Sequence, residues 1–487
     1  MPNAIASVML ILWPVISVIL FQRMPLERAV LWCLIAGYLI LPPVAEFDLP
    51  LVPDLDKSSI PSLVVFLLCV FVLKKRISFW PKPILAKALV LLFVLGVVPT
   101  VLTNRDTLIF ETVQNAAPTV FFNGAVPGLR LIDLGSVVVN QLIVLIPFFV
   151  GRRFFASPQG QREIAIALVI AAIFYSIPGF VEIRLSPQVN TWVYGFFQHD
   201  FSQTIRQGGY RPLVFLEHPL WYALFVTYAV LSAAILMKMS KDKQQVRYGF
   251  ALLYLFGFLF LCKSLATQIY VLCFIPILLW SPIKTQLRIC VILGVIAIVY
   301  PMLRNFEVIP LDAIMAQAEA YSAERAQSLG YRLDNEELML ARAAEKPLFG
   351  WGGWGRNLVR DIQTGEIISI PDGRWIIVFG TFGWFGYIAE IGLLTLPLFY
   401  LWQQMRHRDV EDVSPYIGVL VIVLSVTLLD MLLNATLIPF TWLCAGAILG
   451  YAEQLKYPNL DEQRRKLFQG NLAIGDTRTP KEQRSVM

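Results

Sequence analysis

Charge is scarce in this chain. Of its 487 residues, 15% are Asp, Glu, Lys or Arg and only three are histidine, whereas an average soluble domain carries charge on about a quarter of its residues. This deficit excludes an ordinary soluble fold. Cysteine is rare as well, no C-x-x-C pair occurs, and all six cysteines fall within apolar runs: Cys33, Cys69, Cys262, Cys273, Cys290 and Cys444. Such placement predicts neither a disulfide framework nor a cysteine-bound metal.

Long apolar runs take the place of the missing charge. Hydrophobic residues make up 57% of the chain, in stretches such as "AIASVMLILWPVISVILF" at 4–21. A helix needs about 20 mostly apolar residues to cross a bilayer, and only structures that satisfy their own backbone hydrogen bonds can do so. The sequence therefore predicts an all-α polytopic membrane protein with about thirteen spans, at 4–21, 28–43, 60–73, 84–103, 131–150, 163–181, 213–237, 247–262, 265–280, 287–303, 375–402, 415–434 and 437–453.

The spans divide the chain into four parts. We expect about ten N-terminal transmembrane helices in 1–303, a large extracytoplasmic loop at 304–374, about three further spans in 375–454 and a polar cytoplasmic tail at 455–487. In the large loop, "PLDAIMAQAEAYSAERAQSLG" is typical of an amphipathic helix. A second helix is predicted to begin at Asp334, which with Glu337 has the spacing of an N-cap box.

Lysine and arginine gather in alternate loops, for example Lys74-Lys75-Arg76 and Arg152-Arg153. By the positive-inside rule these loops are cytoplasmic, which puts the C-terminus inside and, for an odd number of spans, the N-terminus outside. His407, between Arg406 and Arg408, is then cytoplasmic. The outer segments include an acidic loop at 44–59 and longer stretches at 104–130, 182–212 and 304–374. Because the net charge of +6 is spread over short loops, it indicates orientation and no nucleic-acid partner.

One glycine-rich stretch has the spacing G-x-G-x-x-G, from Gly350 to Gly355 in "PLFGWGGWGRN". A dinucleotide-binding loop of this pattern follows a strand, opens a helix and has an acidic residue about 20 positions later. Here the preceding residues are helical in pattern and the stretch is predicted to lie outside the cell. We therefore expect a tight turn, with Trp351 and Trp354 at the membrane interface.

The order of several short motifs resembles the O-antigen ligase and polysaccharide polymerase superfamily. "SLGYRLDNEELMLARAAEKPLFGWGGWGRN" is similar to that family's outer-loop pattern of an arginine, a helical run and "PLFGxGxG", with Arg332 as the arginine. Asp372 and Gly383 have the H-x10-G spacing of the ligases, with aspartate in place of histidine. "RQGGYRPLVFLEHPLWYA" resembles an outer arginine followed by His-Pro entering a span, with Arg211 and His218 as the matching residues.

The resemblance implies a glycosyltransferase without metal or cofactor, acting on an undecaprenyl-pyrophosphate-linked glycan at the outer face of the bacterial cytoplasmic membrane. Three outer arginines, Arg206, Arg211 and Arg332, are candidates to hold the leaving pyrophosphate, because guanidinium groups grip phosphate oxygens through paired hydrogen bonds. His218, Glu217 and Asp372 are candidates for the base that takes the acceptor proton, with His199 as a further histidine of the same loop. Trp351 and Trp354 are candidates to stack on sugars, although interface placement explains them equally well.

Several functions remain open from the sequence. A polymerase of repeat units is favoured over a ligase that moves the glycan to a lipid or protein acceptor, because Asp372 replaces the ligase histidine. Membrane lipid, a flippase and a chain-length regulator are the partners that the family implies. A transporter is the runner-up. Transporters usually contain internal repeats and carry ionisable residues within their spans. Here the sequence shows no internal repeat, and the only candidates for such ionisable residues are Lys87, Asp133 and Asp430. A scaffold or sensor subunit without enzymatic activity is the third possible function.

Overall fold

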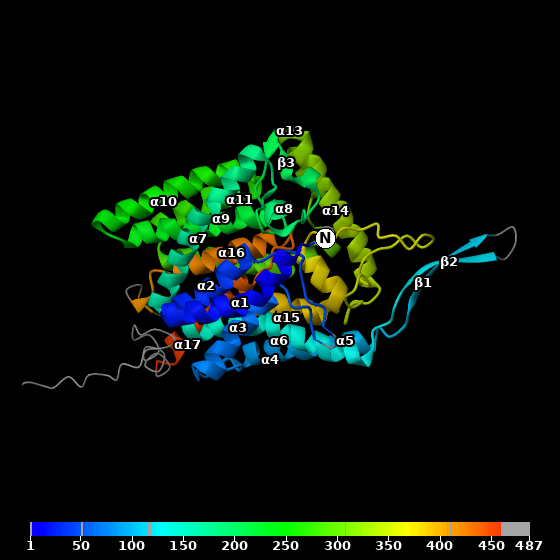
Figure 1. The fold of residues 1–487 in the computed structure, drawn as a ribbon, viewed down its shortest axis with the longest axis horizontal. Coiled ribbons are helices and arrows are strands. Elements are labelled where there is room, and N and C mark those ends of the chain that lie inside the picture. Colours follow the sequence, from blue (N-terminus) through cyan, green and yellow to red (C-terminus); the bar gives the residue numbers. More distant parts are fainter. Residues whose placement is uncertain are drawn as a thin grey trace, which may run out of the picture.

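The computed structural model describes residues 2–49, 52–114, 119–306, 308–406, 408–409 and 412–458. The described chain is a bundle of long helices that run roughly side by side (Figure 1). Its helices are α1 (Ala4–Arg23), α2 (Leu26–Ile40), α3 (Ser59–Leu67, continued by a π-helical turn at Leu68–Val72), α4 (Ile84–Leu95), α5 (Val97–Leu102), α6 (Leu131–Phe154), α7 (Pro158–Leu185), α8 (Val189–Tyr194), α9 (Pro219–Met239), α10 (Asp242–Leu261), α11 (Leu265–Trp280), α12 (Ile283–Asn305), α13 (Leu311–Tyr321), α14 (Ala323–Ala344), α15 (Arg374–Met405), α16 (Ile417–Asp430) and α17 (Pro439–Lys456).

Each of the thirteen apolar segments predicted from the sequence is helical over most of its length. Seven of the described helices are long and apolar enough to cross a membrane: α4 with α5 taken together, and α1, α6, α7, α9, α12 and α15. Shorter apolar helices occur at Ser59–Val72, Leu265–Trp280 and Ile417–Asp430. The predicted start of the seventh span at residue 213 was wrong, because residues 211–218 form an irregular loop and α9 begins at Pro219. His407 and almost all of the tail at 455–487 lie outside the described residues.

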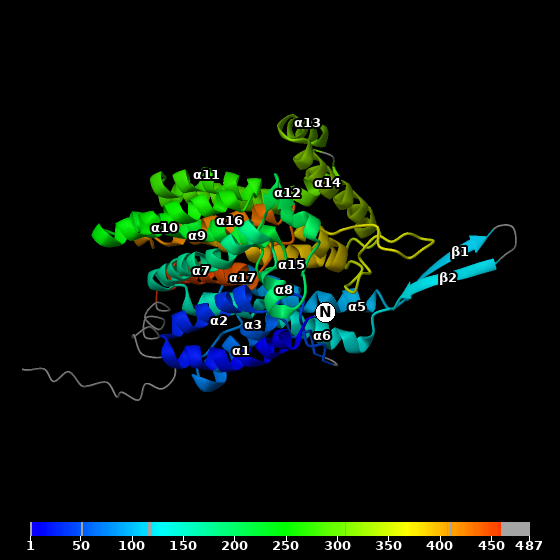
Figure 2. The same cartoon turned by 45° about the horizontal axis from the view of Figure 1, so that its top comes forward.

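The middle of the bundle is formed by α9, α16 and α17, whose side chains are nearly all buried. Helix α17 packs along α6 and α15, and α9 packs against α7, α10 and α11. Most non-helical mass gathers at one end of the bundle, with α14, the segment 345–373 and a β-hairpin (Figures 1 and 2). We call this the loop end.

Two features of the loop end differ from the predictions. Residues 323–344 form one continuous helix, so Asp334 lies in mid-helix and the predicted N-cap box was wrong. The break between the amphipathic helices falls instead at Ser322, whose extended backbone separates α13 from α14. The outer segment 104–130 contains an antiparallel pair of strands, β1 (Leu108–Gln114) and β2 (Thr119–Val126), which projects away from the bundle (Figure 2).

Helix α15 is broken at Gly383, whose backbone is left-handed with φ 63°. The guanidinium of Arg374 donates two hydrogen bonds, of 2.7 and 2.6 Å, to the carboxylate of Glu390. In a straight helix, residues 16 positions apart lie about 24 Å from each other along the axis. The first turns of α15 must therefore fold back beside the following part of the same helix.

The glycine-rich segment supplies the hydrogen bonds that the broken helix lacks. Trp351 N donates to Gly380 O and Gly352 N to Thr381 O, each at 2.9 Å, while Trp384 N donates to Pro347 O at 2.8 Å. These amide groups are consequently occupied by carbonyl oxygens and do not form a phosphate-binding loop. The tight turn expected from the sequence is present, since Gly350, Gly352 and Gly355 all have positive φ.

Candidate functional site

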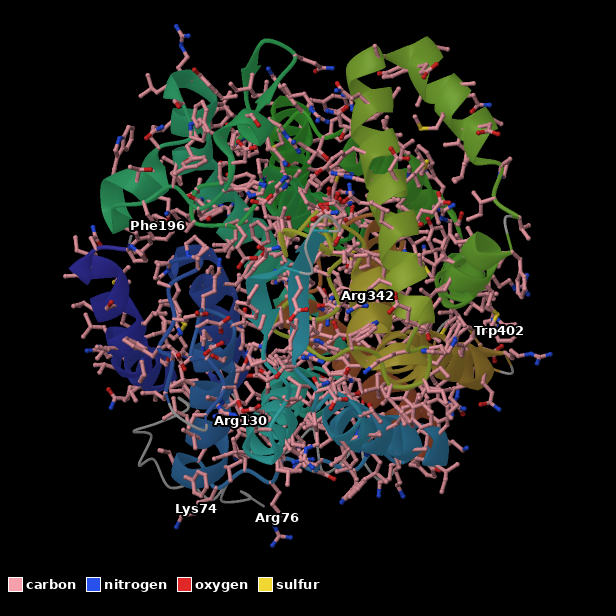
Figure 3. All side chains as sticks on the ribbon, turned by 90° about the vertical axis from the view of Figure 1, so that its right-hand side faces the viewer. Lys74, Arg76, Arg130, Phe196, Arg342 and Trp402 are labelled. Atoms are coloured by element: carbon pink, nitrogen blue, oxygen red, sulfur yellow. The ribbon has the colours of Figure 1, made fainter. Side chains whose placement is uncertain are left out.

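A cavity of about 750 Å³ opens at the loop end between the loop that precedes α9, the middle of α14 and the segment before α15. We call it the arginine cavity. Figure 3 looks onto this end of the molecule, with Arg342 of α14 and Arg130 at the start of α6 labelled. The cavity brings together six of the eight site residues predicted from the sequence, together with the second histidine of the same loop: Arg206, Arg211, Arg332, Glu217, His218, Asp372 and His199.

The two tryptophans lie elsewhere. Trp351 is 7% exposed, and its ring packs under the guanidinium of Arg342, 3.4 Å from the ring centroid, and under the ammonium of Lys346 at 4.3 Å. Its indole N–H donates to Arg342 O at 2.8 Å. The prediction of Trp351 as an interface anchor was therefore wrong, because cation–π contacts and burial hold it inside the loop end. Trp354 is exposed and borders a different cavity.

A buried carboxylate at the end of α7 holds the loop that carries Arg211 and His218. Glu182 accepts hydrogen bonds from Leu213 N and Val214 N, both at 2.8 Å, and from Val189 N at 3.1 Å. Phe215 N donates to the hydroxyl of Tyr175 at 3.0 Å. Since the loop has no regular structure of its own, these bonds fix its path. Glu182 was missed from the sequence, although a lone glutamate near the end of an apolar run is a signal for such a role.

Arg206 and Arg211 are placed by a small hairpin. Strands β3 (Ile205–Arg206) and β4 (Gly209–Tyr210) pair across a turn in which Gln207 and Gly208 both have positive φ, the backbone that a two-residue hairpin requires. Arg211 N then donates to Thr204 O at 2.8 Å. Lys263, from the short turn between α10 and α11, donates to Arg206 O at 3.0 Å. The hairpin thus brings both arginines to one wall of the cavity.

Arg332, from the middle of α14, and Asp372, near the end of the large loop, meet in the cavity. Glu336, one turn after Arg332, forms an ion pair with Arg304 of α12 at 2.5 Å and accepts from Trp375 Nε1 at 3.1 Å, which fixes α14 on the bundle. Ile370 N donates to Asn335 Oδ1 at 2.7 Å and attaches the following segment to α14. Arg332 Nε consequently lies 3.7 Å from Asp372 Oδ2.

Arg211 has an unusual electrostatic environment. Its side chain is 3% exposed, and its one hydrogen bond to the described residues runs from Nη1 to Gln203 O at 3.4 Å. Nε and Nη2 are buried without a partner in the part of the chain that the structure describes. Burial, together with the nearby charges of Arg206, Arg332 and Arg325, lowers the pKa of Arg211 to about 9. The guanidinium is therefore charged at pH 7, and within the described ranges no carboxylate forms an ion pair with it.

His218 is held as a neutral ring. Burial and the neighbouring positive charges, Arg211 first among them, shift its pKa well below the ordinary histidine value. Nδ1 accepts a hydrogen bond from Leu220 N at 2.9 Å, so the proton of the neutral ring is on Nε2, 3.1 Å from Gln203 Oε1. The His199 ring lies edge-on to it, with centroids 4.7 Å apart. His218 is arranged to donate a hydrogen bond.

The two carboxylates of the cavity differ in their surroundings. Burial raises the pKa of Asp372, and the charges of Arg332 and His199 oppose this shift. Glu217 lies near Lys57, an almost fully buried ammonium whose pKa is lowered by burial and raised by the charges of Glu217 and Asp56. Glu217 therefore balances a buried cation, whereas Asp372 faces the arginines. No group of three or more Asp, Glu, His or Cys side chains suited to a metal ion is found among the described residues.

No family model matches the chain, and no curated protein matches it either. The apolar helices define a multi-pass α-helical membrane protein. Beyond that class, its function has to be inferred from the arginine cavity.

Proposed function

We propose that the protein transfers a glycan from a polyprenyl pyrophosphate carrier, such as undecaprenyl pyrophosphate, to an acceptor hydroxyl, and that it joins repeat units into a polysaccharide. The observation that carries this proposal is Arg211, a buried guanidinium whose Nε and Nη2 have no hydrogen-bond partner among the residues that the structure describes, beside Arg206 and Arg332 in one cavity. A buried cation without a counter-ion is costly, and an incoming dianion would relieve that cost. Guanidinium forks match the oxygens of a pyrophosphate.

The proposed reaction requires stabilisation of the leaving pyrophosphate and a base for the acceptor hydroxyl. A glycosidic C–O bond forms between the acceptor oxygen and the anomeric carbon, while the bond from that carbon to the carrier pyrophosphate breaks and its electron pair leaves with the pyrophosphate. The arginines stabilise the charge that develops on this leaving group. The acceptor proton passes to Asp372, whose raised pKa brings it closer to the ambient pH at which a general base works best. His218 donates a hydrogen bond through Nε2.

We further propose that the loop end faces the extracytoplasmic side of the bacterial cytoplasmic membrane. Thirteen spans put the N-terminus, which lies at the loop end (Figure 1), outside and the C-terminus inside. The loops rich in Lys and Arg would then be cytoplasmic, as the positive-inside rule requires. A carrier lipid in the outer leaflet could present its pyrophosphate to the arginine cavity from the side.

Removal of the gene, followed by analysis of the surface glycan, tests this function. A polymerase is indicated if long chains disappear while single repeats are still exported. Long chains that accumulate on the carrier would indicate a ligase instead, and an unchanged glycan with a lost solute flux would indicate a transporter. Either of the last two results overturns the proposed polymerase.

The arginines can be tested separately. Arg211→Lys keeps a charge but loses the planar fork, and Arg332→Ala removes a charge, so each should reduce transfer by about 100-fold or more. Arg247→Ala, in the second turn of α10 and outside the lining of the cavity, is the matched control and should stay near wild type. The measurement is formation of polymer from purified lipid-linked repeats in membranes containing equal amounts of each variant. Wild-type activity in Arg211→Lys would exclude the proposed role of Arg211 in holding the leaving pyrophosphate.

A further inference from the structure

A second cavity, of about 970 Å³, opens at the loop end and has the opposite charge. We call it the acidic cavity. Its rim carries five carboxylates: Glu46, Asp48, Asp54, Asp56 and Asp133. Two arginines also border it, but Arg130 lies 3.5 Å from Asp133 and Arg374 is held by Glu390 at 2.6 Å. The carboxylates are close enough for their charges to interact, because Asp54, Asp56 and Asp48 add to burial in raising the pKa of Glu46.

A buried amide points to a ligand in this cavity. Gln141 of α6 is 7% exposed and lines the cavity, yet it forms no hydrogen bond with the described residues. An amide carries two donors and an acceptor, and those of Gln141 are open to a ligand in the cavity. Deeper in the cavity the walls are apolar and come from α4, α6, α15 and α17, through Phe93, Val144, Pro147, Ile377 and Trp442. The cavity is thus polar at its rim and apolar at depth.

Neighbouring residues of the same two chain segments line the acidic cavity and the arginine cavity. Asp372 and Asn434 line the arginine cavity, whereas Arg374, two residues further along, and Leu437 line the acidic one. Arg374 N donates to Asn434 O at 3.2 Å, which ties these two wall segments together. Asp372 therefore stands at the boundary between a cationic and an anionic compartment.

We propose that the acidic cavity binds the acceptor saccharide and selects neutral or amine-bearing sugars over acidic ones. This inference rests on the proposed transfer reaction. Sugar hydroxyls are hydrogen-bond donors, and bonds to carboxylates are stronger than those between neutral groups. A uronate or phosphate on the acceptor would meet like charges. The apolar depth suits sugar C–H faces or the start of a lipid tail. The acceptor hydroxyl would reach the anomeric carbon at the Asp372 boundary and give its proton to that carboxylate.

A divalent cation is the other ligand that carboxylates can hold, and Asp54 and Asp56 have Asp-x-Asp spacing. The geometry does not favour it. Asp56 Oδ1 accepts from Ser58 N at 2.9 Å and from Ser59 N at 2.7 Å, so it caps the start of α3. Among the described residues the carboxylates do not converge as a group of three on one point, and oxygen sites for such cations use six or more ligands.

Photolabelling of the full-length protein in lipid nanodiscs tests the inference. The probes are dodecyl maltoside and dodecyl glucuronide, each with a diazirine on the alkyl chain, and labelled peptides are located by mass spectrometry. We expect the neutral probe to label residues 129–147 and 374–382 about tenfold more than the acidic probe does. Equal labelling by both probes, or label spread evenly over the lipid-facing helices, would overturn the proposal.

Variants separate the contributions. Gln141→Leu removes the buried amide and should reduce labelling by the neutral probe about tenfold. Glu46→Gln with Asp54→Asn should bring the labelling ratio of the two probes close to one, while Asp312→Asn, an exposed acid of α13, should leave it unchanged. Arg211→Lys should not alter labelling. A protein that labels as expected but transfers no glycan would therefore count against the proposed function alone, and a protein that transfers glycan without discrimination would count against this inference alone.

Discussion

At the scale of single residues, the pairing of Asp372 with Arg332 makes a prediction about pH. If Asp372 is the base, transfer requires its ionised form, and because burial raises its pKa activity should fall on acidification at a higher pH than an ordinary aspartate would give. His218 stays neutral in this window, since its pKa is shifted downward. The charge of Arg332 lowers the pKa of Asp372, so Arg332→Ala should move the acid limb of the residual activity to higher pH. The rate of polymer formation against pH measures both effects.

A matched carboxylate provides the control. Asp372→Asn should abolish transfer at every pH, whereas Asp361→Asn, at an aspartate of the same large loop that does not line the arginine cavity, should retain the wild-type profile. An unchanged acid limb in Arg332→Ala would contradict the assignment of Asp372.

Sequence alone located most of the polar residues of the site. Arg206, Arg211, Arg332, His218, Glu217 and Asp372 were chosen from three separate segments, and the structure brings all six into one cavity. The sequence could not show which contacts hold each of these side chains in place. The tautomer of His218 depends on the amide of Leu220, and the isolation of Arg211 depends on which carboxylates are absent around it. Trp351 was misplaced because exposure cannot be read from residue type in a loop that packs on itself.

At the scale of elements, the contact between the glycine-rich segment and broken helix α15 predicts unequal costs for three glycines. A Cβ at Gly350 would lie 2.4 Å from the backbone of Thr381, and one at Gly383 would lie 2.4 Å from the backbone of Leu348. Both residues also have positive φ, which costs a residue with a side chain about 1–2 kcal/mol. Alanine at either position should therefore lower the thermal stability of the detergent-solubilised protein and reduce transfer.

Gly353 belongs to the same motif and supplies the comparison. A Cβ there meets nothing within 4 Å, so Gly353→Ala should change stability by less than about 0.5 kcal/mol. Equal melting temperatures for all three variants would show that the segment does not support α15.

Glu182 makes a second prediction at this scale. In Glu182→Gln, an amide NH₂ would face some of the three backbone N–H donors that the carboxylate now satisfies, at a cost of about 1–3 kcal/mol. We expect lower thermal stability and weaker donor binding, seen as a rise in KM for lipid-linked repeats. Glu163, also in α7, pairs with the half-exposed Arg28 of α2, and Glu163→Gln should have little effect. A Glu182→Gln protein with the wild-type KM would contradict the positioning role.

The elements that sequence reasoning missed depend on contacts between distant segments. Residues 323–344 continue as one helix through Asp334 because Glu336 anchors that stretch to α12 and α15, and tertiary contact outweighs a local capping pattern. The break in α15 gives no local signal beyond Gly383 itself, since its hydrogen bonds come from residues 347–352. The apolar segments were easier to predict from the sequence, because length and composition alone predict a helix in a bilayer.

At the scale of the whole molecule, sidedness can be tested by chemical labelling. Ser202 is exposed and lines the arginine cavity, and Lys243 is exposed in the first turn of α10, at the far end of the bundle. In intact cells a membrane-impermeant maleimide should label Ser202→Cys and should reach Lys243→Cys only after the cells are opened. Five of the six native cysteines are buried, and Cys273 lies in the apolar helix α11, so background labelling should be low. The reverse pattern would place the site in the cytoplasm.

One of the charges that suggested this orientation has another role. Arg152, predicted to be a loop residue, is 5% exposed and forms an ion pair with Glu453 of α17 at 2.9 Å. It also donates to the backbone oxygens of Ser78 and Trp80. Arg152 thus joins α6, α17 and the chain before α4, and sidedness rests more firmly on the exposed Lys238, Lys241 and Lys243, where α9 ends and α10 begins.

The break in α15 also bears on how the protein is made. A helix that leaves carbonyl groups free cannot remain in a bilayer by itself, so α15 depends on residues 347–352 to complete it. Those residues precede α15 in the chain. If the large loop is translocated as it leaves the ribosome, its glycine-rich segment is already across the membrane when α15 arrives. The order of synthesis then supplies the partner before the segment that needs it, and a circular permutant opened between residues 356 and 373 would have to insert α15 unaided.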